Sequence, residues 1–261
     1  MNRRLIVLLS LFAFIVFIIV LSSTVFSFHT AQVNFLSTTN YLDDSEQNIL
    51  NSAEFNYGES IFFIDREEYT SKIEVANPYI KVVGLEIVFP SKLIIHAVER
   101  NEMFAFKLSN NTYAICDSEL KVLELKQTFV NTNQNAILID NIGYTIPTEN
   151  AALGTFIAMP EAYINLIKNF SEYSMEWDYN LANLRGNIKQ ITLNYEEDNQ
   201  LLIDMRQGLQ IIVKDANLKL QDKLQMAYSV YDSEQIDRTK GILLVLEQLD
   251  GEIVAAYDNG E

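Results

Sequence analysis

The sequence has little of what several common protein classes need. Its 261 residues include one cysteine and two histidines. A single cysteine cannot form an internal disulfide, and two histidines cannot fill an ordinary zinc site by themselves. Positive charge is also scarce, because 19 Lys and Arg residues stand against 35 Asp and Glu residues, for a formal net charge of -16. Such a balance repels phosphate groups, so we expect no binding to nucleic acid.

Catalytic motifs are missing as well. The nine glycines are scattered singly, and the sequence has no phosphate-binding glycine loop, dinucleotide fingerprint or nucleophile elbow. Neighbouring carboxylates occur at Asp43-Asp44, Glu67-Glu68 and 196–198, where helix caps or turns explain them. His96 and Cys116 could act together as base and nucleophile, but their apolar neighbours favour ordinary packing. We therefore expect no catalytic residue, cofactor, metal or small-molecule substrate.

A long apolar run dominates the amino terminus. No residue from Leu5 to Phe28 is ionisable, and a helix of that length, at about 1.5 Å per residue, crosses a hydrocarbon core of about 30 Å. The alternative is a cleaved signal peptide, whose apolar region usually has about 7 to 15 residues, so we favour an uncleaved transmembrane helix. Without Arg3 and Arg4, the chain has 17 basic and 35 acidic residues, a net charge of -18. We expect residues 1–4 in the cytoplasm and the acidic body outside, in the cell membrane as a single-pass protein.

The first part of the body alternates strand and helix patterns. Asp44 with Gln47, and Asp65 with Glu68, are typical of capping boxes at helix starts, and Pro78 ends the second helix. The predicted elements are a strand at 31–36, a helix near 44–53, a short buried run at 61–64, a helix near 66–76, and strands at 81–89 and 92–99. Two helices would cover one face of this small sheet and leave its edges open to a partner strand.

The second part is also α+β and is rich in strand patterns. Pro160 can start a helix, and Asp215 can cap another. The predicted elements are a hairpin of 104–108 and 113–116, a strand at 136–139, strands at 188–195, 201–206 and 209–214, and a closing hairpin of 242–247 and 252–257. The fold class expected is therefore α+β, with one amino-terminal transmembrane helix, a β-α-α-β-β unit and a second domain rich in antiparallel strands.

This order of elements resembles the bacterial cell-division family FtsQ/DivIB, in which a POTRA domain follows a single membrane helix. The stretch from Ile61 to Arg100 carries most of the resemblance, followed by Tyr113 to Asp117 and Val122-Leu123. The motif residues, whose role we expect to be mainly structural, are Asn77, Pro78, Tyr79, Ile80, Phe89, Pro90, Glu99 and Arg100. The resemblance implies a transmembrane helix at 5–28, a POTRA domain at 29–100, a β-rich FtsQ/DivIB-type domain at 101–257 and an acidic tail at 258–261.

The resemblance also implies a function. Members of the family are not enzymes but scaffolds at the division septum, where they recruit or regulate septal wall synthesis. The implied partners are FtsB/DivIC-like and FtsL-like membrane proteins and the septal synthase complex. We expect a partner segment to pair with the terminal strand, formed by Glu252, Ile253, Val254, Ala255, Ala256 and Tyr257. Proline at Val254 or Ala256 should block this pairing, because proline lacks a backbone donor.

Three other functions remain open from the sequence. A membrane-anchored extracytoplasmic hydrolase would need two buried carboxylates that face one cleft. Another POTRA-type assembly or secretion factor would need tandem POTRA units or a membrane β-barrel. A cleaved and secreted binding protein would be recognised by amino-terminal sequencing of the mature chain.

Overall fold

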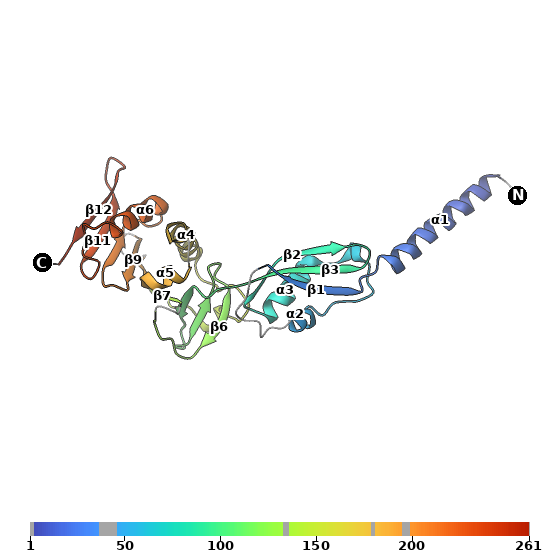
Figure 1. Cartoon of the computed structure of the whole chain (residues 1–261), viewed down its shortest axis with the longest axis horizontal. Helices are drawn as coiled ribbons and strands as arrows, with labels where there is room; N and C mark the ends of the chain where they lie inside the picture. Colours follow the sequence, from blue (N-terminus) through green and yellow to red (C-terminus); the bar gives the residue numbers. More distant parts are fainter. Residues whose placement is uncertain (1–2, 37–45, 133–135, 179–180, 195–198, 261) are drawn as a thin grey trace. The chain divides into compact units, whose positions relative to one another are not determined.

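The computed structural model describes residues 3–36, 46–132, 136–178, 181–194 and 199–260. The side chains of its first helix are described at positions 7–20 and 25. The chain divides into two compact units, residues 1–100 and residues 101–261 (Figure 1).

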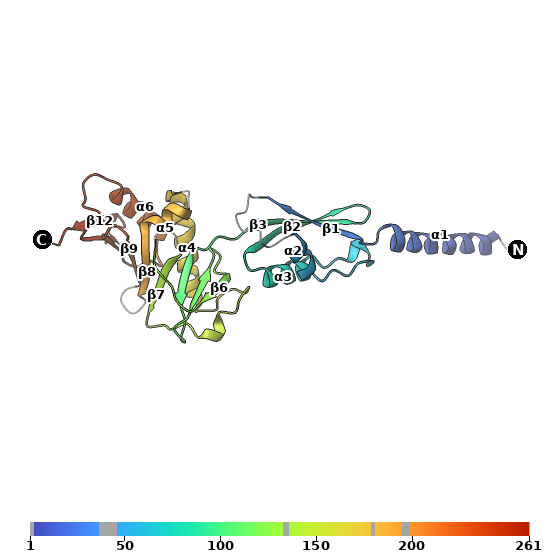
Figure 2. The ribbon, with the colours of Figure 1, turned by 60° about the horizontal axis from the view of Figure 1, so that its bottom comes forward.

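The first unit contains the expected strand-helix-helix-strand-strand order. Its small sheet has the strand order β1-β3-β2, with β1 parallel and β2 antiparallel to β3 (Figure 2). The side chains of Tyr69 and Ile73 pack with Leu93 and Ile95 in its core. The elements are α1 (Arg3–Val25), β1 (Thr30–Phe35), α2 (Glu46–Ser52), the 3-10 helix η1 (Ile61–Phe63), α3 (Arg66–Ala76), β2 (Ile80–Val88) and β3 (Lys92–Glu99).

The second helix of this unit begins where its cap predicts. The Asp65 carboxylate accepts a hydrogen bond from the Glu68 backbone N–H at 3.0 Å, which satisfies one of the free donors at the start of α3. The capping box predicted at Asp44 lies outside the described residues. The run at 61–64 was expected to be buried, and this is wrong for Phe62 and Phe63, whose side chains are exposed, whereas Ile61 is buried.

The amino-terminal helix α1 covers most of the run from Leu5 to Phe28. Among the residues that the structure describes, no helix is both long enough and apolar enough to cross a membrane. The structure therefore does not support the transmembrane helix expected at 5–28, which stays a prediction.

The second unit is built on one nine-stranded sheet. Its strand order is β12-β11-β10-β9-β8-β7-β4-β5-β6, and most neighbouring strands are antiparallel, as expected for this part of the chain. The strands are β4 (Phe104–Lys107), β5 (Tyr113–Cys116), β6 (Val122–Lys126), β7 (Ile137–Ile142), β8 (Ile188–Asn194), β9 (Gln200–Met205), β10 (Gln210–Val213), β11 (Ile242–Glu247) and β12 (Ile253–Asp258). Three pairings are parallel: β4 with β7, β7 with β8, and β10 with β11.

Helices pack on the part of this sheet that contains β8 and β10 to β12 (Figures 1 and 2). They are α4 (Glu161–Asp178), α5 (Leu181–Asn187) and α6 (Leu220–Tyr231), and a 3-10 helix η2 (Thr148–Asn150) precedes them. The α6 helix packs on β10, β11 and β12, and α4 packs on α5 and α6. Trp177 of α4 stacks on Tyr228 of α6 with ring centroids 3.8 Å apart, and its indole N–H donates to Asp232.

One predicted helix start is wrong. Asp215 was expected to cap the last helix, but α6 begins at Leu220. The backbone of both Asp215 and Lys219 is left-handed, at φ +46° and +50°, and such residues interrupt a helix. The buried Lys223 donates through Nζ to the backbone carbonyls of Lys214 and Asp215, and burial lowers its pKa. The turn before α6 is thus held by a lysine rather than by an aspartate cap.

Candidate functional site

The residues predicted to bind a partner lie at one edge of the larger sheet. Ile253 to Tyr257 belong to β12, and Glu252 directly precedes this strand. β12 pairs with β11 on one side and with no other strand on its second side, among the described residues. A strand in this position presents backbone N–H and C=O groups to an incoming chain.

The turn of the closing hairpin fixes which of these groups face outward. Gln248 donates its backbone N–H to the carbonyl of Glu252, which is directly opposite in register, so these two form a hydrogen-bonded pair. Because hydrogen-bonded pairs alternate along an antiparallel ladder, Val254 and Ala256 also direct their N–H groups toward β11. The outward N–H and C=O groups are therefore those of Ile253, Ala255 and Tyr257.

This alternation of inward and outward N–H groups along β12, its phase, corrects the expected effect of proline. Proline at Val254 or Ala256 would delete a hydrogen bond between β11 and β12, so it would weaken the hairpin itself. The phase could have been inferred from the sequence, because the loop Leu249-Asp250-Gly251 is typical of a three-residue hairpin with a left-handed glycine. Gly251 has φ +86° and donates its N–H to the carbonyl of Gln248, as that turn requires.

One face of the edge strand β12 packs against the rest of the second unit. The side chains of Ile253, Ala255 and Tyr257 pack against the core of the second unit, on the side that α6 covers. The Tyr257 hydroxyl also donates to the carbonyls of Asp237 and Lys240, at 3.1 and 3.3 Å. A strand that is already ordered loses little conformational entropy when it pairs with a partner.

A lysine connects the hairpin to the start of α6. Lys219 Nζ lies 2.8 Å from Glu247 Oε1 at the end of β11 and 3.4 Å from the carbonyl of Gly251 in the turn. This contact holds the tip of the hairpin on the body of the unit.

The other sheet edges are partly occupied. On β6, the Val122 N–H donates to the carbonyl of Thr155, and the carbonyl of Val122 accepts from Gly154. On β1, the Val33 N–H donates to the carboxylate of Glu46 at 3.1 Å, and on β2 the Val82 N–H donates to that of Glu74 at 2.9 Å. Each of these edges thus has an outward donor that is already used. β12 has no such contact at Ile253, Ala255 or Tyr257 among the described residues.

Three of the predicted motif residues of the first unit make contacts within its fold. Asn77 ends α3, and its amide donates to the carbonyl of Ile73 and to Ser52 of α2. The Arg100 N–H donates to the carbonyl of Tyr79, and its guanidinium pairs with Glu74. The remaining motif residues are Pro78 after α3, Ile80 at the start of β2, Phe89 and Pro90 in the β2–β3 turn, and Glu99 at the end of β3.

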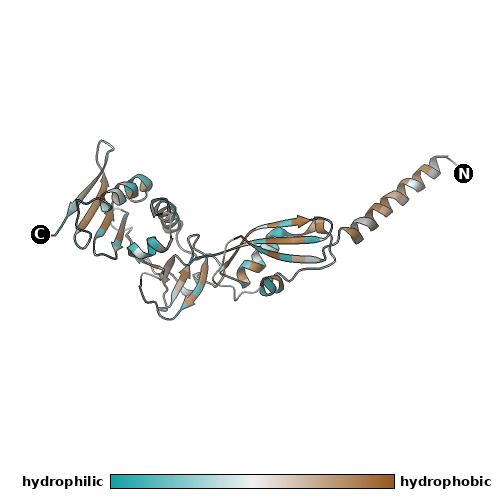
Figure 3. Cartoon of the chain, in the orientation of Figure 1, coloured by the Kyte–Doolittle hydropathy of each residue, from teal (hydrophilic) through white to brown (hydrophobic). Residues whose placement is uncertain are grey.

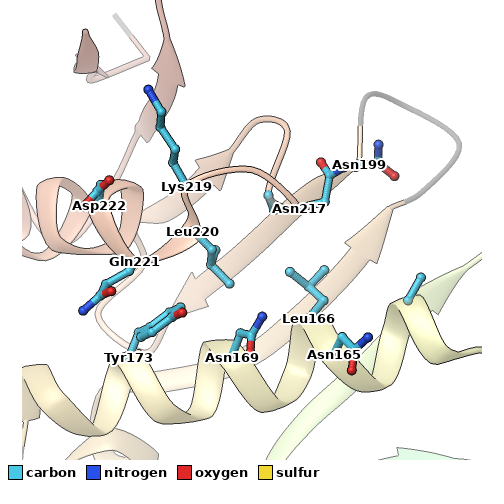
Figure 4. Close-up of a pocket in the computed structure, with 12 residues that line it drawn as sticks. Asn165, Leu166, Asn169, Tyr173, Asn199, Asn217, Lys219, Leu220, Gln221 and Asp222 are labelled. Atoms are coloured by element: carbon cyan, nitrogen blue, oxygen red, sulfur yellow. The ribbon is translucent and has the colours of Figure 1, made fainter. Parts of the chain in front are cut away.

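A groove lies between α4 and the start of α6. Its volume is about 700 Å³, and its lining is rich in amides (Figure 4). They are Asn165, Asn169, Asn199, Asn217 and Gln221. One carboxylate, Asp222, is present among its described lining residues, so the groove offers no carboxylate pair for acid and base catalysis.

A second groove, of about 460 Å³, contains Glu176 and Asp232. Both residues are exposed. The carboxylate of Glu176 accepts a hydrogen bond from Gln221, and that of Asp232 accepts one from Trp177. The hydrolase interpretation needs two buried carboxylates in one cleft, and neither of the two grooves contains such a pair among the described residues.

The possible base His96 and the possible nucleophile Cys116 belong to different units. His96 lies on β3 of the first unit and contacts Glu86 Oε2 at 2.9 Å. Cys116 lies on β5 of the second unit, is completely buried, and burial raises the pKa of its thiol well above the ordinary value. Such a thiol stays protonated at neutral pH and is a poor nucleophile.

The first unit defines a class of domain: two helices packed on a small sheet in the order strand-helix-helix-strand-strand. Residues 28–100 match the family model described as "POTRA domain, FtsQ-type". The chain thus contains an FtsQ-type POTRA domain, which confirms the resemblance to the FtsQ/DivIB family. Such a domain indicates a role in cell division and in protein–protein interaction. A search of curated protein sequences found no match.

Proposed function

We propose that the protein is a non-catalytic scaffold of the cell-division machinery that binds a partner segment along β12. The observation that carries this proposal is the unoccupied edge of the nine-stranded sheet. Its outward groups at Ile253, Ala255 and Tyr257 are ordered by packing and make no hydrogen bond among the described residues. An added strand would gain backbone hydrogen bonds from this edge, and side chains on the two sheet faces would give specificity.

We further propose that α1 anchors the protein in the cell membrane, with the amino terminus in the cytoplasm. Apart from Ser10, every residue from 7 to 20 is apolar (Figure 3), and the burial of these residues places every one of their side chains in the exposed class. A helix that is apolar on all sides needs an apolar environment, either a protein core or lipid. Arg3 and Arg4 before it and the acidic body after it favour this orientation.

The partners in this proposal are FtsB/DivIC-like and FtsL-like division proteins, together with the septal synthase complex that they serve. The edge strand would bind a short extended segment of such a partner. The protein would then help to recruit or regulate septal wall synthesis at the division site.

Localisation in dividing cells tests this function. A fluorescent fusion of the full chain should concentrate at the septum, and it should co-purify with the FtsB/DivIC-like and FtsL-like proteins of the same cell. The membrane fraction should contain the uncleaved chain of 29.9 kDa. A uniform membrane signal without division partners would contradict the scaffold function, and a shortened chain in the soluble fraction would contradict the anchor.

A further inference from the structure

Three phenylalanines gather where the chain leaves α1, and the exposed Phe63 directly follows one of them in the sequence. Phe26 follows the last residue of the helix, Phe62 and Phe63 come from η1, and Phe89 comes from the β2–β3 turn. The ring centroid of Phe26 lies 5.4 Å from that of Phe62 and 6.1 Å from that of Phe89. The ring centroids of Phe62 and Phe89 are 5.7 Å apart. We call these four residues the aromatic cap.

The aromatic cap is exposed although its backbone is fixed. Phe62, Phe63 and Phe89 are 56%, 84% and 59% exposed. The Ile61 N–H donates to the carbonyl of Phe26 at 2.8 Å, and the His29 N–H donates to that of Ser91 at 2.9 Å. Backbone hydrogen bonds therefore hold η1 and the β2–β3 turn to the segment that follows α1, so the rings stand out from an ordered surface.

We propose that the aromatic cap inserts into the outer boundary of the lipid bilayer and holds the POTRA domain against the membrane. This inference rests on the proposed membrane anchor. Phe26 comes one residue after α1 ends at Val25, so an inserted α1 places these rings at the depth of the lipid headgroups. Aromatic rings that are exposed on one side are suited to the boundary between headgroups and acyl chains.

The charges near the cap point to apolar insertion rather than attraction to anionic lipid. Glu59 accepts hydrogen bonds from Tyr69 and Asn56, and Lys92 Nζ donates to Gln32, so these groups already have protein partners. The acidic body, with its net charge of -18 beyond residue 28, would be repelled by anionic headgroups. The cap should therefore insert into neutral phosphatidylcholine without any anionic lipid, and anionic lipid should not strengthen the insertion.

A fluorescent label at the cap tests the insertion. The full chain carrying Phe63→Cys would be labelled with an environment-sensitive dye and reconstituted into phosphatidylcholine vesicles. The native Cys116 is completely buried, so the introduced thiol reacts selectively. The matched control is Leu36→Cys, which is 58% exposed and follows the far end of β1, about 20 Å away at about 3.3 Å per residue.

Insertion predicts a blue-shifted emission at position 63 and strong quenching by a lipid with a shallow nitroxide. Aqueous iodide should quench this label at least about threefold less than the label at position 36. Equal iodide quenching at both positions, with the chain still resistant to carbonate extraction, would overturn the cap proposal and leave the anchor intact. Loss of the chain from carbonate-washed vesicles would instead overturn the anchor. Protection seen in native membranes but not in pure lipid would overturn lipid as the occupant and indicate a protein partner.

Discussion

Replacing Ala255 by proline is expected to lower partner binding at least about tenfold while the protein stays folded. The Ala255 N–H faces outward from β12, so its loss removes a donor that an incoming strand would use. One hydrogen bond contributes about 1 kcal/mol, and the proline ring also obstructs the approaching backbone. Together these effects exceed the roughly 1.4 kcal/mol that corresponds to a tenfold change in affinity. Co-purification with the FtsB/DivIC-like partner measures the loss.

Two further variants separate binding from folding. Ala255→Gly keeps the backbone N–H and removes one methyl group, so binding should stay close to that of the unmodified protein. Ala256→Pro removes an N–H that faces β11, so it should destabilise the closing hairpin. A folded Ala255→Pro variant that co-purifies with its partner as well as the Ala255→Gly variant does would reject β12 as the binding edge.

Replacing Glu74 by glutamine is expected to destabilise the POTRA domain by about 3 kcal/mol. Glu74 Oε2 lies 3.0 Å from the guanidinium of Arg100, and their side chains are 13% and 4% exposed. Glu74→Gln removes the negative charge that faces this buried guanidinium, and breaking a buried ion pair typically costs about 3 to 5 kcal/mol. Glu74 Oε1 also accepts the backbone N–H of Val82, so the same residue supports the edge strand β2. Hydrogen exchange of the α3 and β2 amides in the full chain measures the loss.

The same helix provides a control. Glu68 pairs with Lys72 at 2.7 Å, but both side chains are solvent-accessible, at 56% and 36%. An exposed pair at this spacing contributes about 0.3 to 0.5 kcal/mol, so Glu68→Gln should change exchange very little. Equal effects of Glu68→Gln and Glu74→Gln would show that the buried pair stabilises the domain no more than the exposed pair does.

Local signals in the sequence predicted most of the elements. Asp65 and Glu68 located the start of α3, and the loop at Gly251 located the closing hairpin, because caps and turns depend on a few neighbouring residues. The order of the nine strands could not be predicted in this way. The parallel pairing of β7 with β4 and β8 joins segments that are distant in sequence, and helix α5 (Leu181–Asn187) has no clear local signal.

The candidate site was predicted only in part. The sequence indicated β12 as the edge strand. Its loop Leu249-Asp250-Gly251 also carries the signal for which N–H groups face outward, although the proline prediction placed them at Val254 and Ala256. The apolar run at 61–64, by contrast, could not show which of its side chains are buried. Ile61 faces the interior while Phe62 and Phe63 are exposed, because a 3-10 turn directs successive side chains to different sides.

Residue-resolved amide hydrogen exchange of β12 tests the proposed binding mode most directly. The measurement compares the full chain alone with its complex with the FtsB/DivIC-like partner. Strand addition predicts that the outward amides of Ile253, Ala255 and Tyr257 exchange much more slowly in the complex. Val254 and Ala256, whose amides already bond to β11, should change much less. Unchanged exchange at Ile253, Ala255 and Tyr257 in a fully formed complex would contradict the pairing of a partner strand with this edge.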